Sequence, residues 1–257
     1  MGAEDRPGPT DGPEHSDGPG CQVAGCPAFP PIEPPPTIWD LTSAESGPDD
    51  DLVALGADLA PGTLLAAYRH GLFPMGIGPR GEPPIGWWSP VARGVLRPAD
   101  LRVSRSLRRS VRRYRVTWDR AFAAVVRSCA GQPRSGGWIT DELVDAYITL
   151  HRLGWAHSVE VWAGQELVGG LYGVSIGGLF AGESMFHTAR DASKVALVAL
   201  VGAVRADGDA RRVIDVQWRT EHLASLGVTE VARSTYTLML AQALAAPALK
   251  PPRPPDR

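Results

Sequence analysis

The stretch HSVEVWAGQELVGGLYGVSIGGLFAGESMF, residues 157–186, decides the fold class of this chain. It contains three strand-like runs, 157–164, 166–177 and 178–186, which are separated by turns that carry glycine. Short runs of this kind with glycine turns between them are typical of strands joined by hairpins. The stretch therefore predicts an antiparallel meander.

Helical segments are predicted on both sides of the meander. A helix is expected to begin near Pro61 and to end before Gly71, because proline suits the first helical turn and glycine suits the C-cap. The run RRVIDVQW predicts one more strand, and further helices are expected at 104–114, 140–153, 192–206, 222–226 and 236–245. These elements predict an α+β fold with a mixed, mainly antiparallel sheet and flanking helices.

The domain organisation is predicted from shifts in composition. Residues 1–36 are rich in proline, glycine and acidic residues, which predicts a disordered tail. A small N-terminal domain is expected at 37–100 and a larger domain at 101–247, and residues 248–257 form a second expected tail.

The overall composition is that of an ordinary globular protein, with 44% hydrophobic and 21% charged residues. No apolar run is long enough for a membrane span, and the N-terminus lacks the features of a secretory signal. The three cysteines are too few for a disulfide framework, and a structural zinc needs about four ligands. We expect a cytoplasmic protein without a metal and without a membrane partner.

Basic residues gather outside the acidic N-terminus, and LRVSRSLRRSVRRYRV, residues 101–116, holds seven arginines. Helical spacing places five of them on one face: Arg105, Arg108, Arg109, Arg112 and Arg113. A solvated surface helix is one interpretation. The other is an anionic partner, either the phosphates of RNA or a nucleotide cofactor, because like charges on one face repel each other.

Tryptophans next to glycine or proline form a second candidate feature. Trp87 and Trp88 lie in IGWWSP, and Trp138 lies in SGGWIT. These neighbours predict loops. A tryptophan on a loop can stack on a nucleobase, which contributes about 1–3 kcal/mol, or it can anchor the loop to the core.

Polar residues inside apolar strands form a third. Asp215 and Gln217 are two positions apart, so in a strand they would point to the same face. Glu183 lies near the end of a glycine-rich strand. Buried without partners, such groups would cost a few kcal/mol. Each is expected either to pair with a structural partner or to serve a site.

Seven motifs along the chain resemble a known family. They occur in the order DLVALGADLAPGTLLAAYRHGLFPM, IGWWSPVARGVL, VSRSLRRS, GGWITDELVDAYITLHRLGWAHSVEVW, LVGGLYGVSIGGLFAGESMF, ASKVAL and IDVQWRTEHLASLG. Together they closely resemble the bacterial leucyl/phenylalanyl-tRNA–protein transferase family over about residues 37–240.

The resemblance implies an aminoacyltransferase. Such an enzyme moves Leu or Phe, with Met as a further possible donor, from its tRNA to the N-terminal Arg or Lys of a protein and so marks that protein for degradation (an N-degron). It also implies that the larger domain has an acetyltransferase-like (GNAT-type) fold that uses no coenzyme A or other cofactor. We expect a monomer.

The resemblance also implies roles for the residues singled out above. The five arginines would hold the acceptor stem of the tRNA, and Trp87 and Trp138 would hold its aminoacyl-adenosine end. The pocket for the Leu or Phe side chain would be lined by Leu171, Met185 and Ile214.

In the reaction itself, the resemblance implies that Gln217 orients the attacking amine with electrostatic help from Asp215. Glu183 would neutralise the cationic N-terminal residue of the acceptor. The sequence departs from the family pattern at PDDDLVALGADL, which lacks an Asn-Gly turn, and at Thr220, where Asn is expected.

Two alternatives stay open at this stage. A coenzyme A-dependent N-acetyltransferase would need a glycine-containing pyrophosphate loop before the helix at 192–206, but the sequence there is HTARDASKVAL. A non-catalytic RNA-binding protein would use the arginines and tryptophans but would leave Glu183, Asp215 and Gln217 without a role.

Overall fold

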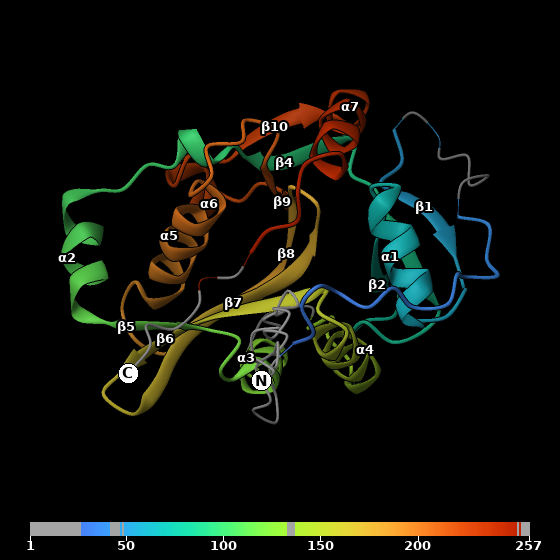
Figure 1. Ribbon diagram of the computed structural model, residues 1–257. Coiled ribbons are helices and arrows are strands. Elements are labelled where there is room, and N and C mark those ends of the chain that lie inside the picture. The colour runs from blue at the N-terminus through green and yellow to red at the C-terminus, as the bar shows by residue number, and fades with distance from the viewer. Residues whose placement is uncertain (1–26, 42–46, 48, 133–136, 251, 253–257) are drawn as a thin grey trace, which may run out of the picture.

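The computed structural model of the protein describes residues 27–41, 47, 49–132, 137–250 and 252. Over these residues the strands form two sheets (Figure 1). The larger sheet has seven strands in the order β10-β4-β9-β8-β7-β6-β5, and the smaller has three in the order β1-β3-β2. The α+β class that the sequence predicts is confirmed.

The predicted meander forms the middle of the larger sheet. Strands β6 (Ala156–Ala163), β7 (Glu166–Ile176) and β8 (Leu179–His187) pair antiparallel in sequence order. The strand predicted from RRVIDVQW is β9 (Val213–Gln217). Among the described strands, β8 and β9 are the one pair that runs parallel, so the sheet is mixed and mainly antiparallel, as expected.

The remaining strands are short and were not predicted. Strands β4 (Ala92–Leu96), β5 (Arg115–Trp118) and β10 (Thr229–Ala232) complete the larger sheet. The smaller sheet consists of β1 (Leu52–Leu55), β2 (Phe73–Gly76) and β3 (Ile85–Trp88). Strand β4 belongs to the larger sheet although it precedes residue 100. The domain boundary expected between residues 100 and 101 stays a prediction.

Six helices match the predicted segments: α1 (Pro61–Arg69), α2 (Arg105–Arg113), α4 (Asp141–Arg152), α5 (Ala192–Val204), α6 (Glu221–Ser225) and α7 (Arg233–Leu244). The side chains of Ser104 and Thr140 accept hydrogen bonds from backbone amides in the first turns of α2 and α4, as N-caps do. Gly71 follows α1 with φ +77°, a conformation that favours glycine. Helix α3 (Phe122–Ala130) and the short 3-10 helix η1 (Pro98–Asp100) were not predicted.

The larger sheet is covered on both faces, with α3 and α4 on one side and α5 on the other (Figure 1). Strand alternation divides the buried side chains between the two cores. On β9, Val213 packs into the core that contains α3 and α4, whereas Ile214 packs into the core that contains α5. Asp215 therefore points toward the first core.

The parallel strands β8 and β9 separate partway along their length. They pair from Leu179 with Val213 to Ala181 with Asp215. Beyond that point β8 continues beside β7, and β9 stays paired with β4 as far as Gln217. A gap thus opens between two neighbouring strands inside the sheet.

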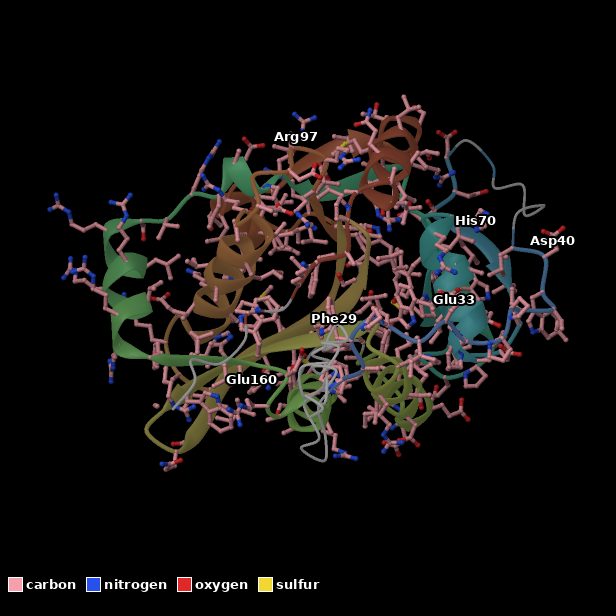
Figure 2. All side chains as sticks on the ribbon, viewed as in Figure 1. Phe29, Glu33, Asp40, His70, Arg97 and Glu160 are labelled. Atoms are coloured by element: carbon pink, nitrogen blue, oxygen red, sulfur yellow. The ribbon has the colours of Figure 1, made fainter. Side chains whose placement is uncertain are left out.

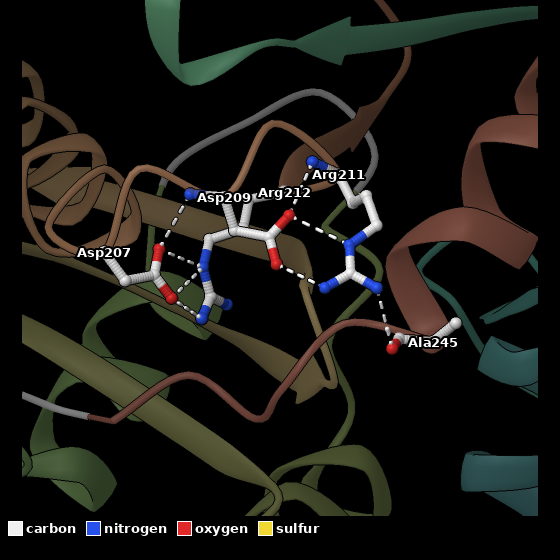
Figure 3. Close-up of polar contacts among 5 residues, drawn as sticks. All are labelled: Asp207, Asp209, Arg211, Arg212 and Ala245. Carbon is white, nitrogen blue, oxygen red and sulfur yellow. Dashed lines mark hydrogen bonds and ion pairs between the residues drawn. The ribbon is translucent and has the colours of Figure 1, made fainter.

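Two arginines anchor the loop that leads into β9 (Figure 3). Arg212 is buried, and its Nε donates to both carboxylate oxygens of Asp207 at 2.9 and 3.0 Å. Arg211 donates hydrogen bonds to the carboxylate of Asp209 from Nε and Nη2 at 3.0 and 2.6 Å. It also donates to the carbonyl of Ala245 at 3.1 Å. These contacts fix where β9 begins relative to the end of α7.

Part of the expected N-terminal tail lies against the body of the protein. The backbone amide of Ile32 donates to the carbonyl of Leu153, and the indole of Trp155 donates to the carbonyl of Ile32, each at 2.8 Å. Glu33 forms an ion pair with Arg69 of α1 at 2.7 Å. Figure 2 labels Phe29 and Glu33 along this segment. Residues 1–26 lie outside the described residues.

Candidate active site

A cavity of about 440 Å³ occupies the gap between the separating strands β8 and β9. Strand β8 contributes Glu183 and Met185 to its wall, and β9 contributes Ile214 and Gln217. Helices α5 and α6 close it from one side. The cavity exists because a parallel pair loses its ladder within the sheet.

The floor of the cavity is apolar. It includes Leu171, Met185 and Ile214, and their assignment to a pocket for Leu or Phe stays a prediction. Leu197 and Leu200 of α5 extend the same surface, although the sequence reasoning did not identify them. Such a surface suits an aliphatic or aromatic side chain, because burying apolar area is favourable by about 25 cal/mol per Å².

Glu183 and Gln217 supply the polar part of the wall. Tyr147 donates a hydrogen bond to Glu183 Oε2 at 2.7 Å, and the Tyr147 and Tyr68 hydroxyls lie 2.7 Å apart. Gln217 Nε2 donates to Glu183 Oε1 at 3.5 Å, a long bond. The tyrosines come from α1 and α4, so both helices help to hold one carboxyl group.

Burial raises the pKa of Glu183 to about 7, although the tyrosine hydrogen bonds and the charge of Arg93 act in the opposite direction. The negative charge of Asp215 raises this pKa further. Near neutral pH the carboxyl group can therefore gain or lose a proton. A group poised in this way can take part in proton transfer.

Asp215 is held in the core and does not line the cavity, whereas Ile214, Val216 and Gln217 of the same strand do. Arg93 Nε and Nη2 donate to its two oxygens at 2.9 and 2.6 Å, and Tyr236 donates at 2.8 Å. The backbone amide of Gln217 donates to Asp215 Oδ1 at 2.9 Å. Asp215 thus has the structural partner that the sequence reasoning left as one alternative.

Gln217 departs from the strand geometry that the sequence predicts. Its φ is +58°, in the left-handed region that residues other than glycine rarely adopt. The alternation of the strand therefore ends at this residue. Its carboxamide lines the cavity, whereas the Asp215 carboxylate stays beside Arg93, so the expectation of two side chains emerging together is wrong.

The tryptophans fall into different places. Trp138 lines the cavity, and its role toward the aminoacyl-adenosine end stays a prediction. Trp87 is fully buried in β3 with its Nε1 donating to the carbonyl of Gly56 at 2.8 Å, so the prediction of a loop is wrong for this residue. Trp88 lies on the same strand, so the prediction of a loop is wrong for it as well, and its Nε1 donates to the carbonyl of Met75 at 2.9 Å. Because the Trp87 side chain has no exposed surface, it cannot stack on a base in this conformation.

Trp218 lines the cavity and was missed in the sequence. Its side chain is partly exposed, and its Nε1 donates to Asp51 Oδ2 at 2.9 Å. It also packs edge-on against Phe73 at 5.1 Å and Trp88 at 6.1 Å. The sequence feature that could have identified Trp218 is its position directly after Gln217. Asp51 belongs to the segment PDDDLVALGADL, whose departure from the family pattern is thereby connected to the cavity.

The arginine face of α2 lies apart from the cavity, on the far side of α5 (Figure 1). Arg105, Arg108, Arg109, Arg112 and Arg113 are all exposed, while Leu107 between them is buried. Within the described residues, no ion pair joins these five arginines to an acidic side chain. The face is an uncompensated positive surface.

Two kinds of feature are absent from the described residues. No group of three or more His, Cys, Asp or Glu side chains could hold a metal ion. No helix in the described part of the chain has the length and apolar character that a bilayer crossing requires.

Comparisons with known proteins agree on one family. The family model "Leucyl/phenylalanyl-tRNA protein transferase" matches residues 95–241, and the model of its N-terminal domain matches residues 57–91. A leucyl/phenylalanyl-tRNA–protein transferase of Anaeromyxobacter sp. (strain Fw109-5) is 52% identical over 225 residues, which cover 83% of this chain and 93% of that protein. One of Stutzerimonas stutzeri (strain A1501) is 53% identical and covers 76% and 86%.

Among solved structures, that of L-PGS from Bacillus licheniformis aligns with a TM-score of 0.35 and 12% identity, over 60% of this chain and 64% of that one. This likeness is too low to carry an argument, so the acetyltransferase part of the fold prediction stays a prediction. The sequence matches are decisive, because they span both sheets and the cavity. The chain belongs to the leucyl/phenylalanyl-tRNA–protein transferase family.

Proposed function

We propose that the protein transfers Leu or Phe from aminoacyl-tRNA to the N-terminal Arg or Lys of acceptor proteins. The observation that carries this proposal is the composition of the cavity. An apolar floor large enough for either side chain lies beside a carboxyl group and a carboxamide that can serve an incoming amine. The names of the homologous transferases support the same reaction.

The donor end of the tRNA enters the cavity with its amino-acid side chain on the apolar floor. The Leu or Phe side chain packs against Leu171, Met185 and Ile214, while Trp138 contacts the terminal adenosine. The pocket discriminates between aliphatic and aromatic donors by shape, and one methylene contributes about 1–3 kcal/mol. The arginine face of α2 binds phosphates of the acceptor stem, which positions the tRNA without reading its sequence.

The reaction converts an ester into an amide. The acceptor's α-amine attacks the ester carbonyl, the C–N bond forms, the bond to the ribose oxygen breaks, and the amine proton ends on that oxygen. Since the ester is already activated, positioning supplies most of the acceleration, up to about 7–11 kcal/mol. No covalent intermediate and no cofactor are required.

Gln217 and Glu183 act on the amine. Gln217 points its Nε2 toward Glu183, which leaves its carboxamide oxygen to accept a hydrogen bond from the amine. Glu183, with its pKa raised to about 7, pairs with the cationic N-terminus and accepts a proton from it. Two basic groups on the acceptor favour the ionised form of this carboxyl.

Asp215 acts as a positioning residue. Its carboxylate binds the backbone amide of Gln217 and is itself fixed by Arg93 and Tyr236. Its charge also reaches Glu183, whose pKa it raises. We further propose that Trp87 is a structural residue of β3 and that the protein works as a monomer.

Transfer of radiolabelled Leu from leucyl-tRNA to a peptide that begins with Arg tests the proposal. The wild type transfers the label, and Gln217→Ala lowers transfer at least about tenfold, a loss of about 1.4 kcal/mol of transition-state stabilisation. Gln165→Ala, which changes an exposed glutamine on the turn between β6 and β7 that does not line the cavity, serves as the matched control.

Two results would favour other activities. Binding of tRNA without transfer to Arg or Lys termini supports the RNA-binding alternative. Acetylation of the peptide from acetyl-coenzyme A supports the N-acetyltransferase alternative.

A further inference from the structure

A second basic surface lies at the rim of the cavity, distinct from the arginine face of α2. His222 of α6 lines the cavity itself. Lys194 lies on α5, one turn before the cavity residue Leu197. His187 is the last residue of β8, two positions after the cavity residue Met185. Three different elements thus bring basic side chains to one edge.

These three side chains act on one another electrostatically. Burial lowers the pKa of His222, and the positive charges of Lys194 and His187 lower it further. Asp191 opposes this effect from the N-terminal end of α5. At neutral pH His222 is therefore an uncharged hydrogen-bonding group, and Lys194 supplies the fixed charge of the rim.

Asp191 compensates only part of this charge, because several groups share its carboxylate. Lys194 Nζ lies 3.6 Å from one oxygen, while Ser110 donates to the other at 2.9 Å. Arg190 Nε is 3.9 Å from the second oxygen. One acid thus faces two cations, and the rim keeps a net positive charge.

The loop between β8 and α5, which contains Arg190 and Asp191, connects the rim to the arginine face. Ser110 and Tyr114 come from α2 and its C-cap, and Tyr114 donates to the carbonyl of Arg190 at 3.0 Å. Arg190 itself is highly exposed. Cationic side chains therefore continue from α2 through the exposed Arg190 to the half-buried Lys194, and the uncharged His222 follows at the cavity.

A donor that rests its stem on α2 and its aminoacyl end in the cavity must lay the intervening strand along this path. That strand carries one phosphate per nucleotide, and lysine is a good point-charge partner for phosphate. We propose that Lys194 and His222 bind the phosphates of the last, single-stranded nucleotides of the tRNA donor. The inference rests on the proposed function and deepens it, since it assigns a phosphate subsite between the arginine face and the cavity.

Three leucylated donors separate this subsite from its neighbours. Leucyl-tRNA engages α2, the rim and the cavity; a leucylated CCA trinucleotide engages the rim and the cavity; leucyl-adenosine, without a phosphate, engages the cavity alone. Lys194→Ala is expected to raise KM for the first two donors about fivefold to tenfold and to leave leucyl-adenosine unchanged, as for one lost charge-assisted contact. His222→Ala is expected to raise KM for the first two donors more than for leucyl-adenosine, whose cavity His222 also lines, and His222→Gln restores part of the loss.

Two control variants make the result specific. Arg109→Ala, on α2, is expected to raise KM for leucyl-tRNA alone. Arg80→Ala, an exposed arginine on the turn of the small sheet, leaves all three donors unchanged. If Lys194→Ala weakens leucyl-adenosine as much as the trinucleotide, Lys194 shapes the cavity and the inference is overturned.

Binding of the unacylated CCA trinucleotide, followed by fluorescence anisotropy, keeps the inference separate from the proposed function. If the wild type transfers Leu from no donor, the proposed function fails. Weaker trinucleotide binding by Lys194→Ala than by Arg80→Ala still supports the phosphate subsite, and equal binding overturns it.

Discussion

At the residue scale, the backbone of Gln217 is strained so that its side chain can reach the cavity. A residue other than glycine at φ +58° costs about 1–2 kcal/mol. The neighbouring hydrogen bond from its amide to Asp215 holds it there. Strain at a functional side chain of this kind is a frequent feature of active sites.

Gln217→Gly is expected to increase the free energy of unfolding by about 1 kcal/mol, because glycine adopts positive φ without strain. Transfer activity falls at the same time, since the carboxamide is lost. Chemical denaturation compared with Gln217→Ala, which loses the side chain but keeps the strain, gives the measurement. Equal stability of the two variants would show that position 217 is not strained.

Glu183 is expected to make the stability of the protein fall as pH rises. Its folded pKa, about 7, lies above the ordinary value of 4.5, so the folded state binds more protons than the unfolded state between these values. The free energy of unfolding therefore decreases from pH 4.5 to above 7, by up to about 3 kcal/mol. Glu183→Gln removes this decrease, and denaturation series at several pH values measure it.

The rate of transfer should also depend on the protonation state of Glu183. Transfer to a peptide that begins with Arg is expected to depend on pH with an apparent pKa near 7, and Glu183→Gln should flatten that profile. A wild-type profile without an inflection near neutral pH would remove Glu183 from the proton transfer.

Several residues of the candidate site could be predicted from the sequence, but the contacts that each of them makes could not. Glu183, Gln217 and Trp138 were selected because polar or aromatic groups are unusual where they stand, and all three line the cavity. The buried place of Trp87 and the partner of Asp215 could not be inferred. Each depends on a contact with a distant part of the chain, such as Arg93, that no local pattern records.

At the element scale, the ion pair between Arg93 of β4 and Asp215 of β9 joins two neighbouring strands inside the core. Both side chains are almost completely buried. Phe73 and Tyr236 cover the guanidinium at 5.1 and 4.3 Å from their ring centres. Breaking one partner of such a pair leaves an uncompensated charge in the interior.

Arg93→Met is expected to destabilise the protein by about 3–5 kcal/mol, because Asp215 then loses its buried counter-charge. Adding Asp215→Asn should restore a large part of that loss, since the remaining group is neutral. A double-mutant cycle of unfolding free energies measures the coupling. Additive losses would show that the pair does not act as a unit.

The elements that the sequence predicted share a strong local signal. Helices α2 and α4 have side-chain N-caps, and the meander strands have glycine turns. The strands that were missed have four or five residues each, too few for a period to emerge. Helix α3 follows Asp119, whose φ of +54° marks a sharp change of direction that the sequence does not signal.

At the scale of the whole molecule, the α+β class was predictable but the strand order was not. The sequence shows which segments alternate, whereas the order β10-β4-β9 depends on pairings between segments far apart in the chain. The separation of β8 and β9, which creates the cavity, is likewise a property of the assembled sheet.

The segment around Ile32 is expected to contribute to global stability. A chain that begins at Thr37 loses the Trp155–Ile32 hydrogen bond and the Glu33–Arg69 ion pair. We expect its free energy of unfolding to fall by about 1–3 kcal/mol relative to a chain that begins at Pro27, which keeps both contacts. Thermal denaturation of the two chains gives the comparison, and identical midpoints would show that the segment adds nothing to stability.

The position of β4 between β9 and β10 has a consequence for the synthesis of the protein on the ribosome. Arg93 and Asp215 are 122 positions apart, so β4 emerges long before either neighbour. Until β9 and α6 follow, the cavity lacks the wall that they provide, including Ile214, Gln217 and His222. Under the proposed function, a nascent chain without these residues has an incomplete site, so transfer is expected to begin only when synthesis of the chain is nearly complete.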